Sequence, residues 1–168
     1  QTPHGRIACE TVVNAAGPWA GLVGALAGVE LPIVPVRRQM LTTTALPMLD
    51  PEFPFVIDFN QSLYFHREGD GLLTGMSNPD QPPGFDESID EEWNLTHLES
   101  AVARLPLLAD AGVRTRWAGL YEVTPDAHPI IGGVPGLAGF YVVAGFSGHG
   151  FMHGPVSGLL LSEIILDG

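Results

Sequence analysis

One glycine-dense segment, Tyr141-Val-Val-Ala-Gly-Phe-Ser-Gly-His-Gly-Phe151, limits the folds open to this chain more than any other feature. It begins as a short apolar strand, and a helix is predicted to follow over about 154–166. The glycines of the loop let backbone amides approach a flat or anionic ligand closely, and a helix N-terminus adds positive partial charge. This arrangement suits a bound cofactor. The alternative is a tight turn into a closely packed helix.

A second strand, turn and helix are predicted near the start of the chain. Arg6 to Val13 is typical of a strand, Asn14-Ala-Ala-Gly-Pro18 of a small-residue turn, and Trp19 to Ala27 of a helix. Pro18 suits the start of that helix, and Gly28 suits its C-terminal cap. Small residues between a strand and a helix occur in many α/β proteins. Together with the glycine-dense segment, however, they predict a second ligand-binding loop.

The middle of the chain has the short alternating runs of an antiparallel meander. These runs are Ile33 to Thr44, Phe55 to Phe59, Ser62 to Glu68 and Leu72 to Ser77, and a separate strand is predicted at about Arg114 to Val123. Gly69-Asp70-Gly71 is predicted to be a hairpin turn between two of them. The meander therefore separates the two predicted ligand-binding loops along the sequence.

A helix is predicted between the meander and the strand at about Arg114 to Val123. Ser88-Ile-Asp-Glu91 has the form of a capping box, which predicts that the helix starts there. The acidic residues at 90–92 then lie in the first turn, where the helix dipole favours them, so we interpret them as structural. The apolar stripe predicted to face the core consists of Ile89, Trp93, Leu98, Val102 and Leu105.

Charge and hydropathy exclude several classes of function. The 19 acidic and 7 basic residues give a net charge of −12, which repels phosphate backbones, so we expect no nucleic-acid partner. The apolar run Gly158 to Leu166 contains Ser162 and Glu163 and falls far short of the roughly 20 residues that span a bilayer. We expect no membrane span. A hydrophobic fraction of 45% leaves room for self-association or for contacts with other subunits.

The single cysteine and the first residues bear on the cellular compartment. Cys9 has no partner for an internal disulfide, and we expect it to be a small buried residue on the first strand. The segment QTPHGRIACE lacks the basic start and apolar stretch of a secretory signal. Both observations lead us to expect a cytoplasmic protein.

Metal binding is the main rival chemistry for the glycine-dense segment. His149 and His153 are four residues apart, which on a helix would place both imidazoles on one face as metal ligands. Gly150 and Gly154-Pro155 argue against a regular helix there, and no acidic or cysteine ligand is near in sequence. We therefore predict no metal site, although a metal-dependent hydrolase stays the third hypothesis.

Four motifs in order resemble the D-amino-acid-oxidase-like family of FAD-dependent oxidoreductases, in its sarcosine oxidase β-subunit, dimethylglycine dehydrogenase and proline dehydrogenase-like branch. The motifs are Val12-Val-Asn-Ala-Ala-Gly-Pro-Trp-Ala20, Trp117-Ala-Gly-Leu-Tyr-Glu-Val-Thr-Pro-Asp126, Pro129-Ile-Ile-Gly132 and Gly145-Phe-Ser-Gly-His-Gly-Phe-Met-His153. The resemblance covers nearly the whole chain but corresponds only to the C-terminal portion of such enzymes. The family's G-x-G-x-x-G nucleotide motif is absent from these residues.

The resemblance implies an incomplete two-part fold of the α+β class. An antiparallel substrate-domain sheet over residues 31–125 would join the C-terminal strand and helices of a Rossmann-like FAD-binding domain, in segments 1–30 and 126–168. Tyr121 would contact the substrate. The residues expected beside FAD are Ala16, Gly17, Trp19, Gly145, Phe146, Gly148, His149, Gly150, Phe151 and Met152.

The implied function is oxidation of the C–N bond of a secondary or tertiary amino acid by hydride transfer to FAD. Two positions depart from the monomeric sarcosine oxidases: Gly119 stands where they have the cysteine that attaches the flavin, and Met152 stands where they have a lysine. We therefore expect non-covalent FAD, and a dehydrogenase is as consistent as an oxidase. The alternative function is a non-catalytic interaction domain of a multisubunit assembly.

Overall fold

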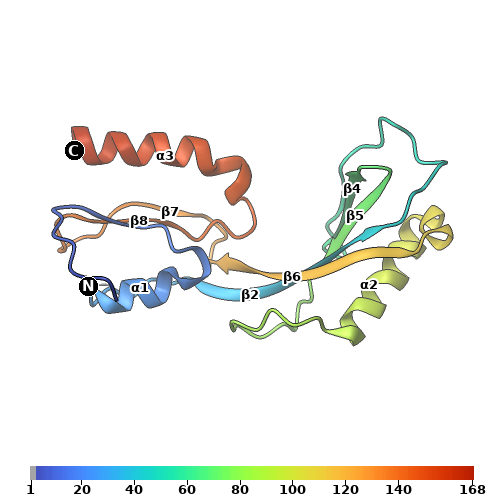
Figure 1. The fold of residues 1–168 in the computed structure, drawn as a ribbon, viewed down its shortest axis with the longest axis horizontal. Coiled ribbons are helices and arrows are strands. Elements are labelled where there is room, and N and C mark those ends of the chain that lie inside the picture. Colours follow the sequence, from blue (N-terminus) through green and yellow to red (C-terminus); the bar gives the residue numbers. More distant parts are fainter. Residues whose placement is uncertain (1–2) are drawn as a thin grey trace. The chain divides into compact units, whose positions relative to one another are not determined.

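The computed structural model describes residues 3–168 and contains two sheets and three α-helices (Figure 1). The helices are α1 (Ala20–Leu26), α2 (Glu91–Arg104) and α3 (Gly150–Asp167), with short 3-10 turns η1 (Gly17–Trp19) and η2 (Pro106–Asp110). The strands are β1 (Val12–Asn14), β2 (Val34–Thr43), β3 (Val56–Asp58), β4 (Leu63–Glu68), β5 (Gly71–Met76), β6 (Val113–Val123), β7 (Ile130–Gly133) and β8 (Phe140–Ala144). The predicted α+β class is confirmed.

The chain divides into two compact units, residues 1–36 with 121–168 and residues 37–120. The first unit is built on a three-stranded sheet in the order β1-β8-β7, in which β1 runs parallel and β7 antiparallel to β8. Helices α1 and α3 lie on opposite sides of this sheet (Figure 1). The role of segments 1–30 and 126–168 in flavin binding stays a prediction.

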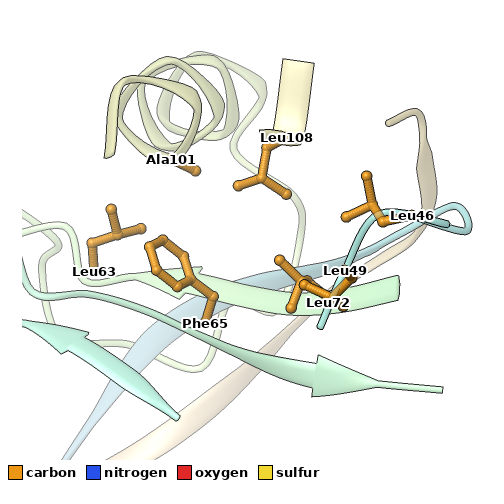
Figure 2. Packing of buried hydrophobic residues seen from close by; sticks show 7 residues of the cluster. All are labelled: Leu46, Leu49, Leu63, Phe65, Leu72, Ala101 and Leu108. Atoms are coloured by element: carbon orange, nitrogen blue, oxygen red, sulfur yellow. The ribbon is translucent and has the colours of Figure 1, made fainter. Parts of the chain in front are cut away.

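The second unit is built on an antiparallel meander. Its strands belong to a five-stranded sheet in the order β3-β4-β5-β2-β6. The predicted turn at Gly69-Asp70 joins β4 to β5, with Glu68 opposite Gly71. One face of the sheet packs against α2 and η2 through a cluster of apolar side chains (Figure 2), namely Leu46, Leu49, Leu63, Phe65, Leu72, Ala101 and Leu108.

The start of α2 differs from the predicted capping box. The N-cap is Asp90, whose carboxylate accepts a hydrogen bond from Trp93 N at 3.0 Å, and Ser88 lies outside the helix. The reason is a distant residue: the side-chain amide of Gln39 bonds both to the backbone N–H and to the backbone carbonyl of Asp90. Arg37 also holds Ser88, by donating to its carbonyl at 2.8 Å.

The buried face of α2 also differs in part from the prediction. Its buried residues are Asn94, His97 and Ala101, whereas the residues of the predicted apolar stripe are half-buried. Val102 and Leu105 of that stripe pack only at the edge of the core. The polar His97 is accommodated because Thr74 of β5 provides a partner, with 2.9 Å between Thr74 Oγ1 and His97 Nε2.

The two ends of the chain bring further corrections. The first strand covers only Val12–Asn14, because it pairs with Phe140–Val142 of β8, a strand that begins after Gly139. Cys9 therefore precedes the strand and is exposed, contrary to the prediction. Helix α3 begins at Gly150 rather than near 154 and includes Pro155. Strand β7 and turn η2 were not predicted.

Pro18 and Gly28 act as predicted, since Pro18 lies in η1 and Gly28 follows α1 with a φ of 74°. Among residues 3–168, no helix is long and apolar enough to cross a membrane.

Acid should destabilise the second unit through His97. Burial lowers the pKa of His97 from 6.5 to about 4, so the folded protein keeps this imidazole neutral where the unfolded chain binds a proton. The contribution of the neutral His97 to the free energy of unfolding is fully present above pH 6.5. It falls by about 3 kcal/mol in total as the pH is lowered towards 4. Urea unfolding of the full-length protein at several pH values measures it. His97→Gln should flatten this part of the pH profile, whereas the exposed control His4→Gln should leave it unchanged.

Candidate functional site

Two loops of the first unit leave the same edge of its sheet. Strands β1 and β8 are parallel, with Asn14 opposite Val142, so their carboxyl ends meet at one edge. The loop after β1 continues into η1, and the loop after β8 continues into α3. We call residues 15–19, which include η1, the first loop, and residues 145–149 the second loop. Ligands of open α/β sheets bind outside the carboxyl ends of the strands, so this edge is the candidate site.

The first loop is fixed by a buried asparagine. Asn14 is almost fully buried, and its amide donates to the carbonyl of Ala20 at 2.9 Å. Its Oδ1 atom accepts a hydrogen bond from Ala16 N at 3.3 Å. One side chain therefore ties the end of β1 both to the loop and to the start of α1. Sequence reasoning treated Asn14 only as a turn residue.

The second loop is fixed by a serine in a left-handed conformation. Ser147 has a φ of 51°, and its N–H donates to the carbonyl of Glu122 at 3.1 Å. Its Oγ atom accepts a hydrogen bond from Thr124 N at 3.3 Å. The last residues of β6 thus form the base on which the second loop rests. The glycine that follows Ser147 was the only sequence signal for this conformation.

The turn after β6 supports the same base. Thr124 is buried, and its hydroxyl donates to the carbonyl of His128 at 2.8 Å. Asp126 accepts a hydrogen bond from His128 N at 3.1 Å, and this bond holds the pKa of the Asp126 carboxyl below its ordinary value. The Thr124-Pro-Asp-Ala-His128 segment is therefore a closed turn rather than a free loop.

Tyr121 lies against the second loop. Gly148 has a φ of 97°, and a methyl group added to it would overlap the Tyr121 ring. The absence of a side chain at Gly148 is therefore what lets the ring pack on the loop backbone. The structure brings the residue predicted to contact substrate next to the loop predicted to bind cofactor. Both roles stay predictions.

The remaining predicted residues differ in exposure. Phe151 is fully exposed on the first turn of α3, and Met152 and Trp19 are also exposed. Phe146, in contrast, is buried and packs under Gly150, whose added Cβ would lie 3.4 Å from the Cβ of Phe146. Phe151, Met152 and Trp19 thus present an apolar surface at the candidate site, whereas Phe146 supports it from below.

The start of α3 gives the site its electrostatic character. The helix has 18 residues and no acidic residue in its first turn, so its N-terminal partial charge, about half a unit, is not neutralised within this described helix. Such an end favours a ligand atom that carries or gains negative charge.

His149 and His153 do come together, although Gly150 and Gly154-Pro155 argued against a regular helix there. Their rings stack with centroids 5.8 Å apart, and His153 N donates to the His149 carbonyl at 3.2 Å. Within residues 3–168, however, no group of three or more histidine, cysteine or acidic side chains gathers in a way that could hold a metal.

The second unit carries an aromatic stack that sequence reasoning missed. Phe55 stacks on Tyr64 at 6.0 Å and on His66 at 5.3 Å between ring centroids. Tyr64 lies opposite Gly75 of β5, where any side chain would overlap its ring. Leu63 and Phe65 alternate with these residues and face the core. The alternation along β4 could have placed Tyr64 and His66 on one face, but Gly75 was recognisable only from the strand register.

Comparisons with known proteins agree with one another. The model of the family described as "FAD dependent oxidoreductase" (DAO) matches residues 1–164. The chain is 33% identical to mitochondrial dimethylglycine dehydrogenase of Mus musculus over 100% of this chain and 21% of that protein. It is also 33% identical to mitochondrial sarcosine dehydrogenase of Homo sapiens, over 100% of this chain and 19% of that protein.

The fold is similar to that of a solved enzyme. The crystal structure of L-proline dehydrogenase from P. horikoshii has a TM-score of 0.85 and 32% sequence identity, over 94% of this chain and 43% of that one. The chain thus spans about a fifth of the length of these curated relatives and less than half of the solved structure.

Proposed function

The chain belongs to the DAO family of FAD-dependent oxidoreductases, and we propose that the protein containing it oxidises the C–N bond of a secondary or tertiary amino acid. Dimethylglycine, sarcosine and proline, which give the similar proteins their names, all carry a substituted nitrogen. The observation that carries the proposal is the meeting of two ordered loops at one sheet edge, beside the exposed start of α3.

The residues of this edge fit a bound flavin. Phe151 and Met152 offer exposed apolar surface to a flat ring, next to the positive end of α3. At Gly17 an added Cβ would meet only the Glu122 carboxylate, at 3.7 Å, so a ligand can approach the backbone of the first loop. Glu122 Oε2 is buried and has no hydrogen-bond partner among the described residues, as expected of a group that binds a ligand donor.

Each part of the chain has a separate task in this proposal. When bound, FAD supplies the redox chemistry by accepting a hydride from the carbon next to the substrate nitrogen. The first loop, held by Asn14, and the second loop, held by Ser147, keep backbone amides in a fixed position. Tyr121, fixed against Gly148, is proposed to contact the substrate.

Non-covalent binding of FAD is part of the proposal. Gly119 has no side chain that could bond to the flavin at the position where monomeric sarcosine oxidases carry their cysteine. Release of the flavin from the full-length protein by acid precipitation would support non-covalent binding. Flavin that stays with the precipitate would contradict it.

A titration with amino acids tests the function. The full-length protein should be purified with the visible absorbance of oxidised flavin, and sarcosine, dimethylglycine or proline added without oxygen should bleach it. Glycine, which has an unsubstituted nitrogen, is the control and should bleach it more slowly. A protein that neither contains nor takes up FAD would overturn the proposal and favour the non-catalytic interaction domain.

A further inference from the structure

Glu122 of β6 is the most unusual polar residue of the candidate site. Its Oε2 atom is buried, and within residues 3–168 it has no hydrogen-bond partner. A buried carboxylate oxygen without a partner costs folding free energy, since it loses its hydrogen bonds to water. Buried polar atoms without a hydrogen-bond partner are rare in native structures, and binding of a ligand donor is one explanation for such an atom.

The position of Glu122 links it to both loops. Its backbone carbonyl accepts the hydrogen bond from Ser147 N at 3.1 Å and so holds the second loop. Its side chain points to the first loop, where the Cβ position of Gly17 lies 3.7 Å from Oε2. The backbone of Glu122 therefore contacts the second loop, and its carboxylate lies beside the first loop.

Neighbouring residues of a strand point to opposite faces, so Glu122 and Tyr121 meet different surroundings. Tyr121 packs against Gly148 of the second loop, whereas Glu122 Oε2 lies near Gly17 of the first loop. The two side chains would therefore contact different parts of one extended ligand. Glu122 is therefore not expected to bind the part of the ligand that Tyr121 contacts.

The chemistry of a carboxylate limits what it can bind. An ionised carboxylate only accepts hydrogen bonds, so the ligand group must be a donor. The phosphates of FAD have no donors and would be repelled, and its flavin ring offers a single ring N–H. Its ribityl chain, in contrast, offers several adjacent hydroxyl groups.

We propose that Glu122 is a cofactor-positioning residue whose carboxylate, buried at Oε2 beside the first loop, accepts a hydrogen bond from a ribityl hydroxyl of FAD. This inference rests on the proposed function, because it requires that FAD binds at this edge. It also explains why a charged side chain is kept beside Gly17 without a partner in the chain.

Glu122→Met in the full-length protein tests the proposal, because it removes both acceptors and keeps much of the volume. The dissociation constant for FAD, measured by fluorescence titration of the apoprotein, should rise about ten- to hundredfold. A hydrogen bond to a charged group contributes about this much to affinity. The melting temperature of the apoprotein should stay the same or rise, because an unpaired carboxylate is removed. Glu122→Gln, which keeps one acceptor, should weaken FAD binding less.

Controls separate this inference from the proposed function. Glu163→Met, at an exposed position of α3, removes the same charge and should change neither quantity. Wild-type protein that binds no FAD would overturn the proposed function itself. Unchanged FAD affinity in Glu122→Met, or an apoprotein that melts at a lower temperature, would overturn only the role of Glu122. An equal loss of affinity for lumiflavin, which lacks the ribityl chain, would overturn the assignment to a hydroxyl group.

Discussion

Replacing Gly148 with alanine is expected to remove most of the bound flavin from the full-length protein. A non-glycine residue at a φ of 97° costs about 1–2 kcal/mol, and the new methyl group also overlaps the Tyr121 ring. Relief of this overlap requires movement of the ring or of the second loop, at a further cost of about 1–3 kcal/mol. The ratio of flavin to protein absorbance, together with the melting temperature, measures both effects.

Gly136→Ala provides the matched control for this prediction. Gly136 also has a positive φ, of 81°, but a methyl group there would meet nothing within 4 Å. It should lower stability by the backbone strain alone and leave the flavin content unchanged. If both variants lose flavin equally, strain in general rather than the contact of Gly148 with Tyr121 is responsible.

Asn14→Ala is expected to loosen the first loop and to lower both stability and flavin affinity. The substitution leaves Ala16 N without its side-chain acceptor and removes the amide that donates to the carbonyl of the buried Ala20. Loss of a partner costs a buried group about 1–3 kcal/mol, and less at the half-buried Ala16 N–H, so the free energy of unfolding should fall by about 2–4 kcal/mol in total. Urea unfolding of the apoprotein and FAD titration measure the two quantities.

Asn14→Asp separates the two hydrogen bonds of Asn14. It keeps an acceptor for Ala16 N but replaces the donor to the Ala20 carbonyl with a buried negative charge, so it should destabilise at least as much as alanine. Asn60→Ala, at an exposed turn, is the control and should change stability by less than about 0.5 kcal/mol. Full flavin affinity in Asn14→Asp would show that the first loop does not depend on this donor.

Local residue types were sufficient to predict some elements of the fold. Pro18 and Gly28 marked the limits of the first helical segment because one fixes a helical φ and the other adopts a positive φ without strain. Gly69-Asp70 marked the hairpin for a similar local reason. The glycine-dense segment likewise indicated a strand, a loop and a helix before any contact was known.

Other features depend on residues far apart in sequence, and local patterns could not reveal them. The start of α2 is set at Asp90 by Gln39, which is 51 residues away. The space for Tyr64 depends on which residue of β5 lies opposite, namely Gly75. In the candidate site, the burial of Glu122 Oε2 and the contact of Tyr121 with Gly148 appear only when β6 lies under the second loop. The motifs predicted where a site could lie but not what holds it together.

Hydrogen exchange of the full-length protein with and without FAD tests the central claim most directly, namely that the first and second loops hold the flavin. Backbone amides of residues 15–17, 19 and 145–153 should exchange more slowly when FAD is bound, because both loops would lose access to water. The turn at 134–139, at the opposite end of β8, should exchange equally in both states. Full binding of FAD without slower exchange in either loop would contradict the account.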